Sequence, residues 1–146
     1  MPAIDPVRLD PAAYPFQREI STRVGDIDGY GHLNAIRLGH FYEEARASFY
    51  FEVFERERMA RTVVAQLNIR YLREGFWPGL VEVGTGILRI GNASFEMGQA
   101  LFQDGRCIGL AETTVVHAPE GVSAPLTAHY RSRLRAMMIG GLVPAE

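Results

Sequence analysis

The feature that most constrains this fold is a change of hydrophobic period near residue 34. Before it, in residues 16–24 (FQREISTRV), the chain alternates between apolar and polar side chains, which is typical of a strand with one wet face. After it, for about twenty residues, the apolar side chains recur at helical spacing. They form one stripe: Leu38, Phe41, Tyr42, Ala45, Phe49 and Val53. This aromatic bulk predicts that the helix lies against a whole sheet.

Four more strands follow the helix. The segment RTVVAQLNIRYLRE alternates clearly, and LVEVGTGILRI, ASFEMGQALFQ and RCIGLAETTVVHA are separated by the turn sequences GNA and DG. The last three strands predict an antiparallel meander, and residues 126–138 predict a short terminal helix. This order predicts an α+β fold whose long helix covers one face of an antiparallel sheet. Because the strands carry few charges, we expect a partner subunit on the other face.

The totals fit a single domain. A chain of 146 residues with 47% hydrophobic and 22% charged residues is ordinary for a globular protein with one core. Prolines spaced along residues 1–15 predict an extended arm, followed by one domain over residues 16–146. The formal net charge of −2 gives no reason to expect a nucleic acid partner.

Cellular location is constrained by three negative observations. The first residues lack the basic-then-apolar order of a secretory signal, and no apolar run approaches the ~18 residues of a membrane span. A single cysteine, Cys107, allows no intrachain disulfide and no cysteine-built metal site. We therefore expect a cytoplasmic protein that has no membrane partner.

The stretch GDIDGYGHLN, residues 25–34, gathers acids, glycines, a histidine and an asparagine directly before the helix. Asp26, Asp28 and Gly31 match three positions of an EF-hand calcium loop. However, Arg37 stands where the loop needs a bidentate glutamate, so a calcium site is excluded.

Two other ligand sites are unsupported. The segment GTGILR lacks the third glycine and the following helix of a dinucleotide site. His40 and Glu43 are spaced like metal ligands on a helix, but no second pair exists, so we expect no metal.

What remains is an acid beside a helix N-terminus. The first amides of a helix lack intrahelical partners and carry a partial positive charge, which suits a developing oxyanion. A carboxylate nearby can act as base or nucleophile. A purely structural reading stays open, in which Asp26 or Asp28 satisfies turn amides and Asn34 only caps the helix.

The segment RVGDIDGYGHLNAIRLGHFYEEAR resembles the hot-dog-fold thioesterases of the 4-hydroxybenzoyl-CoA thioesterase-like superfamily. Members carry a D-x-D-x-x-G-H-V-N-N type loop and then a helix ending in Y-F-E-E-A-R. The positions that match are Asp26, Asp28, Gly31, His32, Asn34, Glu43, Glu44, Ala45 and Arg46. The later segments IRYLREGFWPG, RIGNASFEM and DGRCIGLAETTVVHA also resemble family strands, so the similarity covers about residues 16–138.

The resemblance implies a fold and an activity. The fold is a long helix wrapped by an antiparallel sheet of about five strands, in subunits that pair through a continuous sheet as homodimers and often as homotetramers. The activity is hydrolysis of an acyl-CoA or acyl-carrier-protein thioester, without a metal or redox cofactor.

The resemblance also implies roles for the loop. Asp28 matches the catalytic acid, which attacks the thioester carbonyl or activates water, while Asp26 braces the loop. The three amides at the start of the helix, from Leu33 to Ala35, hold the oxyanion. The implied oxyanion and substrate-binding residues are Gly31, His32, Leu33, Asn34 and Ala35.

Departures from the family pattern leave alternatives open. Ala35, Leu38 and Glu74 replace an asparagine, a tyrosine and a proline, and make the pocket less polar. Because other branches place a catalytic glutamate on the long helix, Glu43 and Glu44 are fallback candidates. A non-catalytic acyl-CoA-binding subunit is the second hypothesis, and a hydratase acting on enoyl-CoA is the third.

Overall fold

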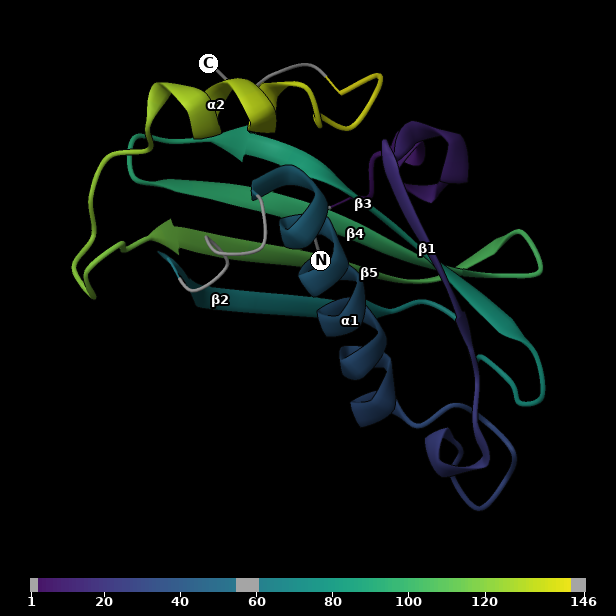
Figure 1. The fold of residues 1–146 in the computed structure, drawn as a ribbon. Coiled ribbons are helices and arrows are strands. Elements are labelled where there is room, and N and C mark those ends of the chain that lie inside the picture. The colour runs from purple at the N-terminus through teal and green to yellow at the C-terminus, as the bar shows by residue number, and fades with distance from the viewer. Residues whose placement is uncertain (1–2, 55–60, 143–146) are drawn as a thin grey trace.

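The computed structural model describes residues 3–54 and 61–142. One long helix, α1 (Ala35–Phe54), crosses one face of a five-stranded antiparallel sheet (Figure 1). The strands are β1 (Phe16–Ser21), β2 (Thr62–Tyr71), β3 (Leu80–Ile90), β4 (Ser94–Gln103) and β5 (Arg106–His117). A second helix, α2 (Ala128–Arg135), and the 3-10 helices η1 (Pro6–Leu9), η2 (Pro11–Ala13) and η3 (Val24–Asp26) complete the elements. This is the α+β arrangement that the sequence pattern predicts, and it is the hot-dog fold that the resemblance implies. None of the described helices is both long and apolar enough to cross a membrane.

The sheet has the order β1-β3-β4-β5-β2. The predicted meander of β3, β4 and β5 is confirmed, and Asp104 and Gly105 turn its second hairpin with φ of +51° and +76°. Strand β1 pairs with the first half of β3, while β2 pairs with β5. The two strands that flank α1 in sequence therefore form opposite edges of the sheet.

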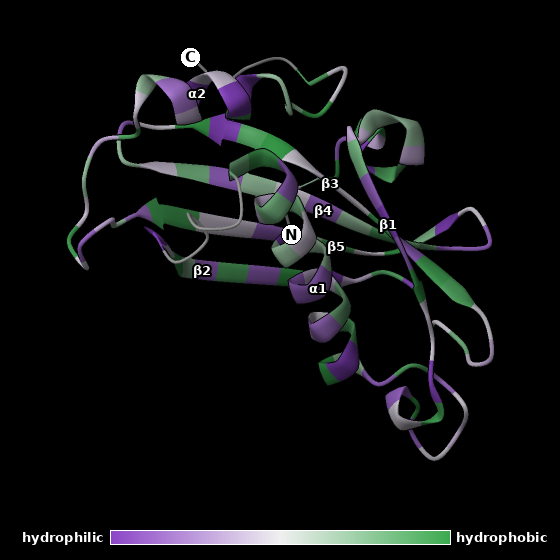
Figure 2. Ribbon diagram, in the orientation of Figure 1, coloured by the Kyte–Doolittle hydropathy of each residue, from purple (hydrophilic) through white to green (hydrophobic). Residues whose placement is uncertain are grey.

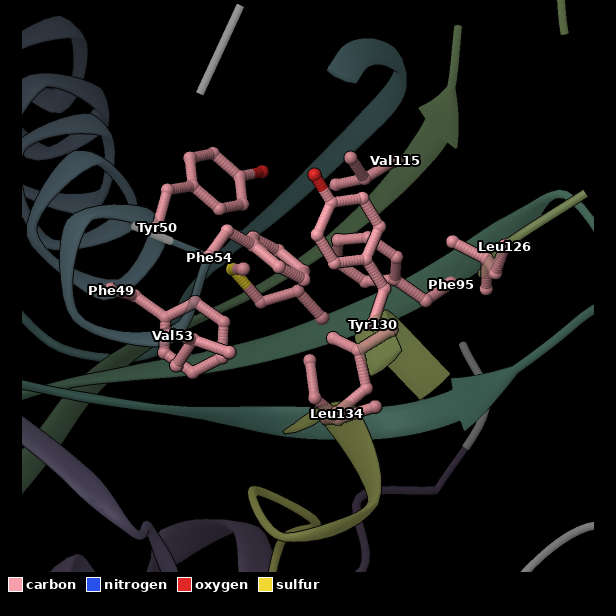
Figure 3. Packing of buried hydrophobic residues seen from close by; sticks show 11 residues of the cluster. Phe49, Tyr50, Val53, Phe54, Phe95, Val115, Leu126, Tyr130 and Leu134 are labelled. Carbon is pink, nitrogen blue, oxygen red and sulfur yellow. The ribbon is translucent and has the colours of Figure 1, made fainter. Parts of the chain in front are cut away.

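The predicted apolar stripe of α1 is buried against the sheet. Figure 3 shows one end of this core, where Phe49 and Phe54 of α1 lie with Phe95 of β4 and with Tyr130 and Leu134 of α2. Helix α2 therefore closes the end of the core towards which α1 runs.

One charged side chain, Arg46, is buried in the same interface. Its guanidinium donates a long hydrogen bond of 3.5 Å to Oε1 of Gln99, and burial lowers its pKa. The helical period places Arg46 beside the stripe, but it did not predict that a charge would be buried there.

Part of the other face of the sheet is covered by the chain itself. The N-terminal strap (residues 3–14) packs there together with Ile139 and Leu142, so on this part the chain itself takes the place of the predicted partner subunit. Tyr14 packs so closely on Gly84 that a Cβ there would come within 2.6 Å of the ring. Ile139 packs in the same way on Gly86 and Gly98, at 2.6 and 2.8 Å. Small residues on the strands thus make room for the two chain ends.

Arg8 fastens the strap. Its buried guanidinium donates to Tyr14 Oη at 2.9 Å and to Glu112 Oε1 at 3.0 Å. It also donates to the carbonyls of Gln99 and Ala111 at 3.2 and 3.4 Å. The strap is therefore held by a cation that is buried and well satisfied. It contains η1 and η2, where the sequence predicted an extended arm.

Strand β2 is an edge strand with exposed apolar side chains. Hydrophobic and hydrophilic residues alternate along it (Figure 2), and a bulge between Val64 and Gln66 shifts its register with β5. Its exposed large apolar residues are Val63, Val64, Leu67 and Tyr71. In the described part of the chain no strand pairs with the outer edge of β2, and an edge with this composition is a natural surface for pairing with another strand.

Candidate active site

Asp26 holds the start of the loop that precedes α1. Its carboxylate is buried, and Oδ2 accepts the Arg23 backbone N–H at 2.8 Å. The Arg23 guanidinium lies 3.7 Å from the other oxygen, Oδ1. The Asp26 carbonyl accepts the Asn34 amide at 2.8 Å. Both ends of the loop are therefore tied to Asp26, and its carboxylate faces the protein.

Asp28 organises the tip of the loop. Its Oδ1 accepts the amides of Tyr30 and His32 at 2.8 and 3.2 Å, and its own N–H donates to the His32 carbonyl at 2.8 Å. Gly31 turns the chain between them with φ of +82°, a conformation that strains other residues. Within the described residues, Oδ2 of this half-buried carboxylate accepts no hydrogen bond, so it is available to react.

The start of α1 offers fewer free amides than the sequence predicts. Leu33 N–H donates to Gly75 O and Asn34 N–H to Asp26 O, both at 2.8 Å. Asn34 is the N-cap, because its Oδ1 accepts the Ile36 amide at 2.9 Å. The Ala35 amide has no acceptor in the part of the chain that the structure describes. Of the three predicted oxyanion donors, it alone points at no protein acceptor there.

A second loop, residues 73–77, packs on the first. His32 Nδ1 lies 3.3 Å from Glu74 Oε1, and the His32 and Phe76 rings meet edge to face at 5.2 Å. Sequence reasoning named no catalytic residue in this loop. It placed Glu74 at the pocket, because Glu74 stands where the family has proline.

The fallback glutamates lie beside a groove between β1 and α1. This groove has a volume of about 440 Å³, and Asp28 is not among the described residues that line it. Glu43 and Glu44 are exposed, and Glu44 lies 3.8 Å from Arg18. The groove is lined by Ile20, Ser21, Arg23, Asp26, His40, Phe41, Glu43, Glu44 and Ala47.

The residues that the structure describes gather no cluster of three His, Cys, Asp or Glu side chains that could hold a metal. Burial raises the pKa of the Cys107 thiol, and it raises the pKa of Tyr50 to about 12. At neutral pH both groups therefore keep their protons.

The sequence model of the Thioesterase-like superfamily matches residues 22–134. The chain belongs to this superfamily. The match takes in the Asp28 loop, α1, and strands β2 to β5. As a member of this superfamily, the protein is a thioester hydrolase.

Solved structures agree with this assignment. A predicted thioesterase from Bacillus stearothermophilus is 26% identical with a TM-score of 0.78, over 84% of this chain and 96% of that one. A thioesterase from Thermus thermophilus, complexed with coenzyme A and Zn, is 26% identical with a TM-score of 0.80, over 85% and 94%. A gentisyl-coenzyme A thioesterase, 17% identical with a TM-score of 0.71 over 82% and 99%, shares the fold. No curated protein matches the chain in sequence.

Proposed function

We propose that this superfamily member hydrolyses an acyl-CoA thioester, with Asp28 as the reacting carboxylate. The observation that carries the proposal is the arrangement of the Asp28 side chain. Two backbone N–H groups fix Oδ1, while Oδ2 accepts no hydrogen bond within the described residues. Coenzyme A as the carrier is supported by the coenzyme A complex of the Thermus thermophilus relative. No cofactor is required in this proposal.

In the proposed reaction, Oδ2 of Asp28 removes a proton from water, and the oxygen of that water attacks the thioester carbonyl. The resulting oxyanion accepts a hydrogen bond from the Ala35 amide at the positive end of α1. The C–S bond then breaks, and the Asp28 carboxyl returns the proton to the leaving thiolate. The products are the free acid and the thiol of coenzyme A. Leu33 and Asn34 support the loop, and His32 and Gly31 shape the pocket.

An alternative route uses Asp28 as a nucleophile. Its carboxylate attacks the carbonyl and expels the thiolate, and water then hydrolyses the mixed anhydride. A single turnover in ¹⁸O-water identifies the nucleophilic route when the label appears in Asp28. Direct attack by water places the label in the released acid, whereas hydrolysis of the anhydride at the aspartyl carbon places it in Asp28.

We also propose that two copies pair through β2. The support is the open edge of β2 with its exposed Val63, Leu67 and Tyr71, and such an edge is prone to pair with another strand. The N-terminal strap, Ile139 and Leu142 cover part of the outer face of the sheet, so a tetramer would need a surface outside this part. The cytoplasmic location stays a prediction from sequence.

The test of the activity is release of free thiol from short, medium, long and aromatic acyl-CoAs, with the free acid identified by mass spectrometry. We expect turnover of at least one class. Binding without turnover across the whole panel would favour the non-catalytic acyl-CoA-binding alternative. Addition of water to an enoyl-CoA without thiol release would favour a hydratase.

A further inference from the structure

We propose that Gln103, at the end of β4, is a positioning residue that sets the geometry of the Asp28 loop. The inference rests on the proposed role of Asp28 in thioester hydrolysis. It assigns a function to a buried side chain that lies outside both loops of the site. Gln103 acts through three successive contacts: its own with Phe76, those of residues 75–77 with residues 31–33, and that of His32 with Asp28.

The first contact is a two-point hydrogen bond. Oε1 of Gln103 accepts the Phe76 backbone N–H at 2.8 Å, and Nε2 donates to the Phe76 carbonyl at 2.8 Å. The Gln103 residue is 9% exposed. A side-chain amide that satisfies both backbone groups of one residue takes the place of a neighbouring strand. Phe76 is thereby fixed in position and in direction.

The second contact joins the two loops by a short antiparallel pairing of His32 with Phe76. It is flanked by the Leu33 N–H bond to Gly75 O at 2.8 Å and the Trp77 N–H bond to Gly31 O at 3.5 Å. This pattern is that of a non-hydrogen-bonded pair, in which the backbone groups of Phe76 point away from His32. The Phe76 N–H and carbonyl therefore point to the side on which the Gln103 side chain hydrogen-bonds with them.

Gly75 allows the loops to lie this close. A Cβ at Gly75 would come within 2.7 Å of Leu33 Cδ1 and 2.9 Å of Ile108 Cδ1. The position of the 73–77 loop therefore determines where Leu33 and the start of α1 lie.

The third contact, between His32 and Asp28, links the position of the second loop to that of the Asp28 carboxylate. His32 N–H donates to Asp28 Oδ1 at 3.2 Å, and Asp28 N–H donates to His32 O at 2.8 Å. A shift of His32 therefore moves Asp28, because the two are bonded in both directions. Asp28 reacts only when Oδ2 faces the thioester, so a displacement of a fraction of an ångström reduces the rate.

Replacing Gln103 by leucine removes both hydrogen bonds and leaves the Phe76 N–H and carbonyl without these partners. We expect kcat to fall about ten- to a hundred-fold, as misplacement of a reacting group does. We expect KM to stay within about twofold of the wild-type value, because Gln103 makes no contact with the substrate in this proposal.

The matched control is Thr22→Val. Thr22 Oγ1 donates to the Gly79 carbonyl at 2.8 Å, so it also holds the chain between β2 and β3, but at a point beyond Phe76. The Thr22 backbone N–H donates to the same carbonyl at 2.9 Å and is kept in the variant. We expect the kcat of this control to stay within about twofold of the wild-type value.

A second variant, Gln103→Glu, preserves size and loses only the donor to Phe76 O. Protonation of the new carboxyl restores that donor, so its kcat relative to wild type rises as the pH falls.

The experiment compares wild type, Gln103→Leu, Gln103→Glu and Thr22→Val by steady-state kinetics and by hydrogen exchange of the His32 and Leu33 amides. The expected result is faster exchange at both amides and a lower kcat in Gln103→Leu, with both unchanged in Thr22→Val. Unchanged exchange overturns the proposal, and so does faster exchange with an unchanged kcat. An equal loss of kcat in Thr22→Val also overturns it, because the effect would then be a general loosening of the fold.

Failure of the proposed activity is distinguished by the wild type. If wild type releases no thiol from any acyl-CoA, the hydrolytic role of Asp28 fails. The exchange of His32 and Leu33 in the Gln103 variants then still decides whether Gln103 sets the loop. If Gln103→Leu does not fold, Gln103→Glu supplies both measurements.

Discussion

Replacing Arg8 by methionine is expected to lower the free energy of unfolding by about 3 kcal/mol. Arg8 is buried and donates to Glu112, Tyr14 and two backbone carbonyls. Removing one partner of a buried ion pair costs roughly 3–5 kcal/mol, because the other charge is left uncompensated. The lower end of this energy range applies here. The Glu112 side chain is 19% exposed, and its carboxylate lies 3.6 Å from the Arg70 guanidinium, so its charge stays partly compensated.

The assay is urea unfolding followed by circular dichroism at a fixed protomer concentration, because self-association would add to apparent stability. Glu112→Gln and the double variant complete a cycle with Arg8→Met. We expect the double variant to lose at least ~1 kcal/mol less than the sum of the single losses. Faster hydrogen exchange of Gly140, whose amide donates to Ala13 O at 2.8 Å, would report undocking of the N-terminal strap.

A stability of Arg8→Met within about 0.5 kcal/mol of wild type would refute this reasoning. It would mean that the buried contacts of Arg8 contribute nothing net, and that the strap covers the outer face without being fastened to it. A strictly additive cycle would refute the narrower claim that Arg8 and Glu112 act as a pair.

Three further perturbations test separate parts of the fold. Gly84→Ala places a methyl group within 2.6 Å of the Tyr14 ring, so calorimetry is expected to show a loss of about 1–3 kcal/mol; a neutral result would contradict the close packing. Asn34→Ala removes the cap on the Ile36 amide and should cost about 1 kcal/mol in urea unfolding, whereas Asn34→Ser should cost less. Burial raises the pKa of Tyr14 and Tyr50 to about 12, above the ordinary value of 10.0. Folding stability is therefore full below about pH 10 and declines as the pH rises towards 12, which a tyrosinate absorbance titration with circular dichroism can follow.

The secondary structure could be predicted because each element has one clear period. The apolar stripe marks α1, which the structure describes over Ala35–Phe54. The alternating segments correspond to β2 to β5, with ends within a few residues of those predicted. Strand β1 ends at Ser21, short of the predicted residue 24, because η3 begins at Val24. Between β1 and η3, the Thr22 hydroxyl donates a hydrogen bond to the Gly79 carbonyl.

The covering of the outer face could not be predicted in the same way. The packing of the N-terminal strap was not predicted, because its prolines disfavour regular secondary structure but do not prevent the segment from packing on the sheet. Nothing local to Arg8 indicates that its partner is Glu112, a residue far along the chain. The few charges on the strands indicated that the outer face is apolar enough to need a cover, but not that the N-terminal strap covers part of it.

The site was predictable only where it is local. The Asp28 loop and the cap at Asn34 lie within ten residues of sequence, so their motif is visible. The engagement of the Leu33 amide by Gly75, and the contact of Gln103 with Phe76, depend on how distant segments meet in the fold. For this reason the sequence predicted three amides for the oxyanion, while the structure leaves the Ala35 amide as the one without an acceptor in its described part.

The most direct test of the central claim is the kcat for thiol release by Asp28→Asn and wild type, measured side by side on the best acyl-CoA. Asparagine keeps the Oδ1 acceptor for the amides of Tyr30 and His32, so the loop should remain folded and the thermal midpoint nearly unchanged. The account predicts that kcat falls by at least about a hundred-fold. Full activity in a folded Asp28→Asn protein would contradict it, and Glu43 and Glu44 would then become the residues to replace.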